Sequence, residues 1–346
     1  PGWGKYLVGP LQLGTCYGAV IALILLGGQS LKYIYLVGWP EDGRLKLYHF
    51  IAIFGGLALI MAQMPSFHSL RHINLVSLLL SLAYCACITV GAVYVGKRYS
   101  KDERKRDYSI AGTSIDRIFG VFNAISIVAT NYGNGIVPEI QATVSAPVTG
   151  KMVKGLILCY GVVIATFFSV AISGYWAFGK DSQQSVLSNF LQQNGKPLLP
   201  KWLLVTTNVF TLLQLTAVTL VYLQPTNVVL ENQLSDPKKG QFSTRNVVPR
   251  LISRSLSVIV ATSLAAMLPF FGDMMALFGA FGVIPLDFIL PMIFYNVTFK
   301  NSARRSVYRV NAAIVAVSVV LVSVGAVASV RQIVLDSKTY KLFANM

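Results

Sequence analysis

The stretch GLILCYGVVIATFFSVAISGYWAF, from Gly155 to Phe178, contains no charged residue. A helix of about 20 residues crosses the roughly 30 Å hydrocarbon core of a bilayer, because each residue adds about 1.5 Å. A membrane-spanning strand would need only about 10 residues and would alternate apolar with polar side chains. The stretch is longer and does not alternate, so it predicts a transmembrane α-helix.

The chain contains nine such apolar stretches, separated by segments rich in charges, prolines and glycines. They are Val8–Leu36, Leu47–Met64, Ile73–Val95, Ile118–Val144, Gly155–Phe178, Trp202–Leu223, Leu251–Phe271, Met274–Tyr295 and Val307–Val330. Between the seventh and eighth we expect a tight turn at Phe271-Gly272-Asp273, because about 45 apolar residues are too many for one crossing. The predicted fold is all-α and integral to the membrane, a polytopic helical bundle formed by a single transmembrane domain over residues 1–346.

The composition of the 346-residue chain excludes an ordinary soluble protein. Only 12% of the residues are charged and 54% are hydrophobic, whereas soluble domains carry about 25% charged residues. The net charge of +16 would suggest nucleic acid on a soluble domain, but here the basic residues lie between apolar stretches, as in membrane loops. We therefore expect a lipid bilayer and no nucleic acid as partner. The sequence contains no metal-ligand spacing and no catalytic motif, so we expect neither a metal site nor an enzyme.

The fourth stretch is interrupted by Asn131-Tyr132-Gly133-Asn134-Gly135-Ile136-Val137-Pro138. Two glycines and a proline within six residues break a helix. At membrane depth a break is tolerated where the backbone lines a protein-walled cavity, as in secondary transporters. Freed N–H groups attract a carboxylate and freed carbonyls attract an ammonium, so the break predicts a site for a zwitterion such as an amino acid. The alternative is a glycine-rich packing kink.

Three stretches contribute candidate substrate-binding residues. The candidates are Asn131, Tyr132, Gly133, Asn134 and Gly135 at the break, Gln12 and Thr15 on the first stretch, and Asn208, Thr211 and Gln214 on the sixth. Spacings of three and four residues place side chains on one face of a helix, and we expect the Asn208 face to point inward. The alternative is that these polar side chains only join helices together.

Two carboxyl groups are candidate proton carriers. Glu139 follows the break, and burial would let it load and release a proton near physiological pH. Its alternative role is a headgroup-level ion pair with Lys151 or Lys154. Asp287 lies within the eighth stretch, shortly before Pro291. It is a second proton or cation candidate, and the alternative there is a structural cap on a proline-broken helix.

Several motifs of many consecutive residues run through the chain. They include Ala62-Gln63-Met64-Pro65-Ser66-Phe67-His68-Ser69-Leu70-Arg71, Gly133 to Thr143, Gly174-Tyr175-Trp176-Ala177-Phe178-Gly179 and Tyr222-Leu223-Gln224-Pro225-Thr226-Asn227. In these motifs the chain resembles the plant amino acid/auxin permease family. Within it the chain is most similar to the plant gamma-aminobutyric acid transporters, through Met267 to Asp273, Pro285-Leu286-Asp287-Phe288 and Leu342-Phe343-Ala344-Asn345.

The resemblance implies an eleven-helix, proton-coupled symporter with a leucine-transporter-like fold. The nine stretches would be its third to eleventh helices, so we expect a domain that lacks the family's first two helices. The stretch Ile118–Val144 would correspond to the sixth helix, one of two discontinuous helices that hold substrate. We expect no cofactor, since a proton gradient would supply the driving force.

These expectations combine into one function with two alternatives. The chain is expected to import gamma-aminobutyrate or related small amino acids together with a proton. Its expected location is the plasma membrane, with an internal membrane such as the vacuolar one as the alternative. The first alternative function is an auxin influx carrier, which would take up an indole acid. The second is a truncated, non-transporting membrane protein that acts as a receptor or as a partner of intact carriers.

Overall fold

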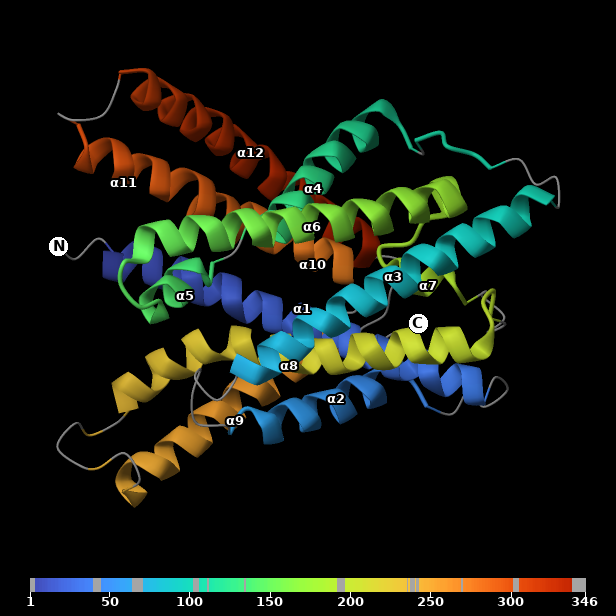
Figure 1. Ribbon diagram of the computed structural model, residues 1–346, viewed down its shortest axis with the longest axis horizontal. Coiled ribbons are helices and arrows are strands. Elements are labelled where there is room, and N and C mark those ends of the chain that lie inside the picture. The colour runs from blue at the N-terminus through green and yellow to red at the C-terminus, as the bar shows by residue number, and fades with distance from the viewer. Residues whose placement is uncertain are drawn as a thin grey trace. The chain divides into compact units, whose positions relative to one another are not determined.

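The computed structural model is almost entirely helical. It describes residues 4–39, 45–63, 71–101, 106–110, 112–133, 135–191, 197–234, 236, 240, 243–268, 270–300 and 305–337. Within these residues the longer helices are α1 (Gly9–Gly38), α2 (Leu47–Met61), α3 (Arg71–Lys101), α4 (Ser114–Tyr132), α6 (Val148–Phe178), α8 (Lys201–Leu234), α9 (Thr244–Met267) and α12 (Arg305–Ser337). The shorter ones are η1 (Gly4–Val8), α5 (Val137–Thr143), η3 (Gly179–Asp181), α7 (Val186–Asn189), α10 (Phe271–Phe278), η4 (Gly279–Ile289) and α11 (Leu290–Thr298). Figure 1 shows them as ribbons.

Seven helical segments of the described chain are long and apolar enough to cross a membrane. They are Tyr6–Gly38, Asn74–Arg98, Val148–Asp181, Lys201–Glu231, Thr244–Met267, Phe271–Thr298 and Arg305–Ser337. Each overlaps one of the nine predicted stretches, which confirms a polytopic helical membrane protein. The prediction of nine crossings stays a prediction, because α2 has only 15 residues, about 22 Å of helix, and Ile118–Val144 is divided between α4 and α5.

The boundary between the seventh and eighth stretches was predicted three residues too late. Helix α9 ends at Met267, and Phe271, Gly272 and Asp273 form the first turn of α10. Leu268 leaves the helical region with φ −120° and ψ 76°. It precedes a proline, whose ring disfavours helical geometry at the residue before it. The interruption therefore begins at Leu268, the residue before the proline, and not at Gly272.

The chain divides into two compact units, which we describe separately. The first unit comprises Pro1–Ala19, Gly112–Met152 and Phe270–Lys341, and the second comprises Val20–Ala111, Val153–Pro269 and Leu342–Met346. The single transmembrane domain stays a prediction. In the first unit α4 packs against α10, η4 and α12. Two glycines allow this close packing, since a Cβ at Gly279 would overlap the Ser126 carbonyl oxygen, and one at Gly325 would lie 2.8 Å from Ser126 Oγ.

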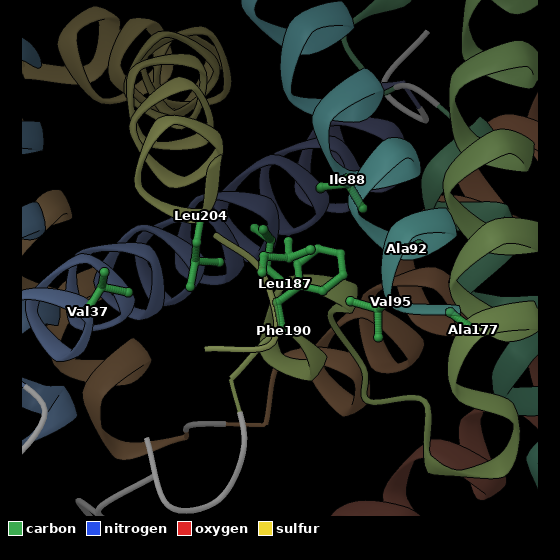
Figure 2. Close-up of a cluster of buried hydrophobic side chains, with 9 residues drawn as sticks. Val37, Ile88, Ala92, Val95, Ala177, Leu187, Phe190 and Leu204 are labelled. Carbon is green, nitrogen blue, oxygen red and sulfur yellow. The ribbon is translucent and has the colours of Figure 1, made fainter. Parts of the chain in front are cut away.

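A cluster of buried apolar side chains forms part of the core of the second unit. Its members come from α1, α3, α6, α7, α8 and the segments beside α7: Val37, Ile88, Ala92, Val95, Ala177, Leu187, Phe190, Leu199 and Leu204. Figure 2 shows Leu187 and Val95 beside the ring of Phe190, which is fully buried. These side chains are up to 167 positions apart in sequence, from Val37 to Leu204, and only tertiary packing brings them together.

The turn after α6 depends on a glycine. Gly179 has φ +58°, and a Cβ there would overlap the Asp107 carbonyl oxygen, which accepts a hydrogen bond from Lys180 N at 2.9 Å. A side chain in the left-handed region costs roughly 1–2 kcal/mol, so we expect Gly179→Ala to lower the unfolding free energy by at least about that amount. Thermal unfolding of the purified protein measures it. Gly161→Ala in α6 is the control, because nothing lies within 4 Å of a Cβ there; equal losses in both variants would contradict the prediction.

Candidate functional site

The predicted break in the fourth stretch is present. Helix α4 ends at Tyr132, and Gly133 is extended, with φ −71° and ψ 148°. The Gly133 N–H donates to the Ala129 carbonyl at 2.6 Å. Helix α5 begins at Val137, with Pro138 in its first turn, where the missing N–H of a proline costs no helical hydrogen bond. The last carbonyls of α4 therefore lie at an interruption of the helix, where the regular helical hydrogen-bond pattern stops.

Two predicted residues of the first stretch lie at this break. Gln12 Nε2 donates to the Gly135 carbonyl oxygen at 3.1 Å. Thr15 lies on the same part of α1, and a Cβ at Gly135 would be 3.9 Å from its Cγ2 atom. The Thr15 hydroxyl donates to the Leu11 carbonyl at 2.8 Å, so it can only accept a further hydrogen bond. Gln12, Thr15 and the break therefore form one polar region within the first unit.

Asp287 contributes a carboxylate to the same region. It lies in η4, a stretch of π-helix that contains Pro285, and π-helical turns are frequent at functional sites. A Cβ at Gly133 would lie 2.5 Å from Asp287 Oδ2 and would overlap Val283 Cγ1. The absence of a side chain at Gly133 therefore lets the carboxylate approach the end of α4. The alternatives for Asp287, a proton or cation site and a structural cap, both stay predictions.

Closely packed glycines hold η4 against α1 and α4. A Cβ at Gly282 would overlap the Thr15 hydroxyl oxygen, and one at Gly135 would lie 2.9 Å from Leu286 Cδ2. Val283, Gly282 and Leu286 were not among the predicted site residues. Their only signal in the sequence is the spacing of Gly279, Gly282 and Pro285, which does not reveal a π-helix.

The other candidates near the break are Asn131, Tyr132, Asn134 and Glu139. Asn131 is exposed, and its Nδ2 donates to the Ile127 carbonyl of its own helix at 3.0 Å. Tyr132 is half-buried at the end of α4. Asn134 lies outside the described residues, and the Glu139 side chain, on α5, lies outside them too.

The three candidates of the sixth stretch lie on α8 in the second unit. Asn208 and Thr211 are buried, which confirms that their shared face points inward, and Gln214 is half-buried. Asn208 Nδ2 donates to the Leu204 carbonyl and the Thr211 hydroxyl to the Thr207 carbonyl, each at 2.8 Å. Such bonds to a carbonyl one turn earlier satisfy polar groups inside an apolar helix. These bonds lie within α8 itself, so they support neither the alternative of joining helices nor a role in binding substrate, and both stay predictions.

Two carboxylates outside the apolar segments, Asp107 and Asp116, are paired with basic side chains. A hydrogen bond from Lys180 holds the pKa of Asp107 well below its usual range. Hydrogen bonds from the Thr113 hydroxyl and from Arg331 lower the pKa of Asp116 to about 2. A depressed pKa means that the stabilising interaction is complete above the ordinary value near 4 and is lost as the pH falls through the folded value. Both carboxylates therefore remain ionised between about pH 5 and pH 8.

The chain has several apolar helices that can cross a membrane, and one helix is broken beside a polar region. These features are typical of a multi-pass membrane protein of the transporter class. Comparison of sequences identifies the family. The family described as transmembrane amino acid transporter protein matches residues 2–334, and the chain belongs to it. The family confirms the resemblance to amino acid permeases and the expectation that the chain is not an enzyme.

Individual relatives are plant transporters. The chain is 55% identical over 347 residues to GABA transporter 1 of Arabidopsis thaliana, across 100% of this chain and 76% of the relative. It is 29% identical over 346 residues to Lysine histidine transporter-like 1 of the same plant, across 99% of this chain and 73% of the relative. Lysine histidine transporter-like 3 is 30% identical over 304 residues, across 86% and 64% of the two chains.

Proposed function

We propose that this chain is a proton-coupled symporter that imports gamma-aminobutyrate or related small amino acids. The observation that carries the proposal is the 55% identity, along the whole chain, to a protein named GABA transporter 1. The family supports an amino acid as the substrate and a membrane as the location. We propose the plasma membrane as that location, since import requires it.

The polar region of the first unit suits the ammonium end of such a substrate. The C-terminal end of a helix carries a partial negative charge, and α4 ends beside the Asp287 carboxylate. An ammonium group placed there would gain charge-assisted hydrogen bonds. Gln12 already donates to the Gly135 carbonyl, so it orients the interrupted backbone. The prediction that the backbone N–H groups of the break attract the substrate carboxylate stays a prediction.

The proton would be carried by a carboxyl group near the substrate. Asp107 and Asp116 are unsuited to this role, because their hydrogen bonds keep both ionised over the physiological pH range. Asp287 is half-buried and lies at the break, where loading a proton would change the charge that the substrate meets. Glu139 remains the second candidate.

Uptake of labelled gamma-aminobutyrate and proline in a transport-deficient yeast strain tests the proposal. We expect uptake to fall at least about tenfold when a proton uncoupler is added, because the gradient drives accumulation. In Asp287→Asn we expect uptake to lose its dependence on external pH, because an amide cannot load a proton. Asp107→Asn is the matched control and should keep the wild-type pH profile.

Three results would contradict parts of the proposal. Uptake that persists with the uncoupler would reject proton coupling. Uptake of an indole acid in place of both amino acids would favour the auxin carrier. Binding of labelled substrate without accumulation, in protein shown to reach the plasma membrane, would favour the non-transporting alternative.

A further inference from the structure

A hydroxyl group in the last turn of α4 joins that helix to α10 within the first unit. Thr130 Oγ1 donates to the Met275 carbonyl oxygen of α10 at 3.0 Å. The same atom lies 2.9 Å from the Ser126 carbonyl oxygen, one turn earlier on α4. Because a hydroxyl carries one proton, the two carbonyls share a single donor. One of them belongs to α4 itself and the other lies 145 positions further along the chain.

Thr166 of α6 shows the more usual arrangement of a helical threonine. Its hydroxyl is also shared between two carbonyls, those of Val162 and Val163, at 2.8 and 3.1 Å. Both acceptors belong to α6, so this hydroxyl is satisfied within its own helix. Thr130 and Thr166 are both half-buried. The difference between them is that the hydroxyl of Thr130 reaches a neighbouring helix.

The Met275 carbonyl lies at the point where α10 changes into η4. The π-helical stretch begins at Gly279, whose N–H donates to the Met275 carbonyl. A carbonyl oxygen has two lone pairs, so it can accept from Gly279 and from Thr130 at once. The close approach requires a glycine, because a Cβ at Gly279 would overlap the Ser126 carbonyl oxygen and lie 2.5 Å from Thr130 Oγ1. Thr130 therefore contacts α10 at the turn from which η4 starts.

η4 extends from this contact to the break. Gly133 follows Thr130 by one turn, and a Cβ at Gly133 would overlap Val283 Cγ1 and lie 2.5 Å from Asp287 Oδ2. Between these two points α4 packs against both α10 and η4. The segment that bears Asp287 is therefore held against α4 at two places, by a hydrogen bond at Met275 and by close packing at Gly133.

We propose that Thr130 is a positioning residue for the substrate region. Its hydrogen bond to Met275 fixes where η4 lies along α4 and keeps the Asp287 carboxylate beside the end of that helix. The apolar contact at Gly133 has no preferred direction, whereas a hydrogen bond is restricted in distance and angle. The consequence for substrate binding rests on the proposed amino acid transport, whereas the positioning of η4 does not.

Amide hydrogen exchange of the purified protein tests the positioning without any need for transport. Thr130→Val removes the hydroxyl and nearly keeps the shape of the side chain. One lost hydrogen bond between neutral groups shifts an opening equilibrium about fivefold, so we expect peptides from residues 271–289 to exchange about fivefold faster than in the wild type. Thr130→Ala removes the same hydroxyl with a good helix former and should show the same acceleration.

Two variants serve as controls for the exchange experiment. Thr130→Ser keeps the hydroxyl and should exchange as the wild type does. Thr166→Val removes a hydroxyl whose two acceptors belong to α6, so it should leave residues 271–289 unchanged. Wild-type exchange of these residues in both Thr130→Val and Thr130→Ala would overturn the proposal. Equal acceleration in Thr130→Ser would also overturn it, because the hydroxyl would then not be the cause.

Uptake kinetics test the consequence for the substrate. We expect Thr130→Val to raise the half-saturation concentration for labelled gamma-aminobutyrate about fivefold, because the ammonium end would meet a displaced carboxylate. Thr130→Ser should keep the wild-type value, and so should Thr166→Val. A merely structural role would lower the amount of protein at the cell surface and leave the half-saturation concentration unchanged.

The two measurements separate this inference from the proposed function. If neither the wild type nor any variant takes up amino acids, the proposed function fails, and hydrogen exchange still decides the positioning of η4. If exchange is accelerated as expected while the half-saturation concentration stays that of the wild type, the link between Thr130 and the substrate is refuted.

Discussion

Replacing Gly133 by alanine is expected to reduce amino acid uptake by at least about tenfold. The added Cβ would overlap Val283 Cγ1 and would lie 2.5 Å from Asp287 Oδ2 and 2.8 Å from the Ala129 carbonyl oxygen. The last of these atoms belongs to the backbone of α4, which cannot withdraw without unwinding the end of the helix. Overpacking of this kind costs about 1–3 kcal/mol, and each 1.4 kcal/mol is a factor of ten in binding or rate. Uptake normalised to the amount of protein at the cell surface measures the effect.

Two other glycines provide graded controls for this prediction. Gly120 lies on the same helix, and nothing is within 4 Å of a Cβ there, so Gly120→Ala should transport as the wild type does. At Gly135 the nearest atom is the end of the Leu286 side chain, at 2.9 Å, so Gly135→Ala should have an intermediate effect. If Gly133→Ala and Gly120→Ala transported equally well, the α4–α5 break would not be part of the site.

Replacing Arg254 by methionine is expected to destabilise the protein by about 3–5 kcal/mol. Arg254 lies on α9 and is 3% exposed; its Nε donates to Glu231 Oε1 at 2.6 Å and a terminal nitrogen donates to the Ala62 carbonyl at 2.9 Å. It thereby joins the ends of α2 and α8. Without it, a largely buried carboxylate loses its cation and a carbonyl loses a donor. Chemical denaturation of the purified protein measures the difference.

Two further variants distinguish the effect of burying the Arg254–Glu231 ion pair from the effect of removing a charge. Lys180 and Asp107 form an exposed pair at 2.5 Å, with 44% and 46% of their side chains accessible. Exposed pairs contribute little, so Lys180→Met should change stability far less than Arg254→Met. Adding Glu231→Leu to Arg254→Met should recover part of the loss, because it removes the unpaired carboxylate. Equal losses for Arg254→Met and Lys180→Met would refute the importance of this buried pair.

The spanning helices and the residues that break a helix could be predicted from the sequence. Uninterrupted stretches such as Gly155–Phe178 predict spanning helices because the bilayer sets their length. The interruption at Gly133 and Pro138 was also predictable, since backbone freedom and a missing N–H act locally. The turn before α10 was misplaced because glycine signals a turn less strictly than a proline restricts the residue before it.

Tertiary structure alone decided which polar residues meet. Gln12 and Asp287 are 275 positions apart, yet each approaches the break, one at Gly135 and the other at Gly133. Asn208, like Gln12, is an amide side chain within an apolar stretch. It nevertheless donates its hydrogen bond within its own helix, in the second unit. Helical periodicity predicts which side chains share a face of a helix. It does not predict which helices pack together, because helix packing depends on how whole helix surfaces fit each other. The sequence by itself therefore determined a helical membrane protein with one broken helix, and packing decided what surrounds the break.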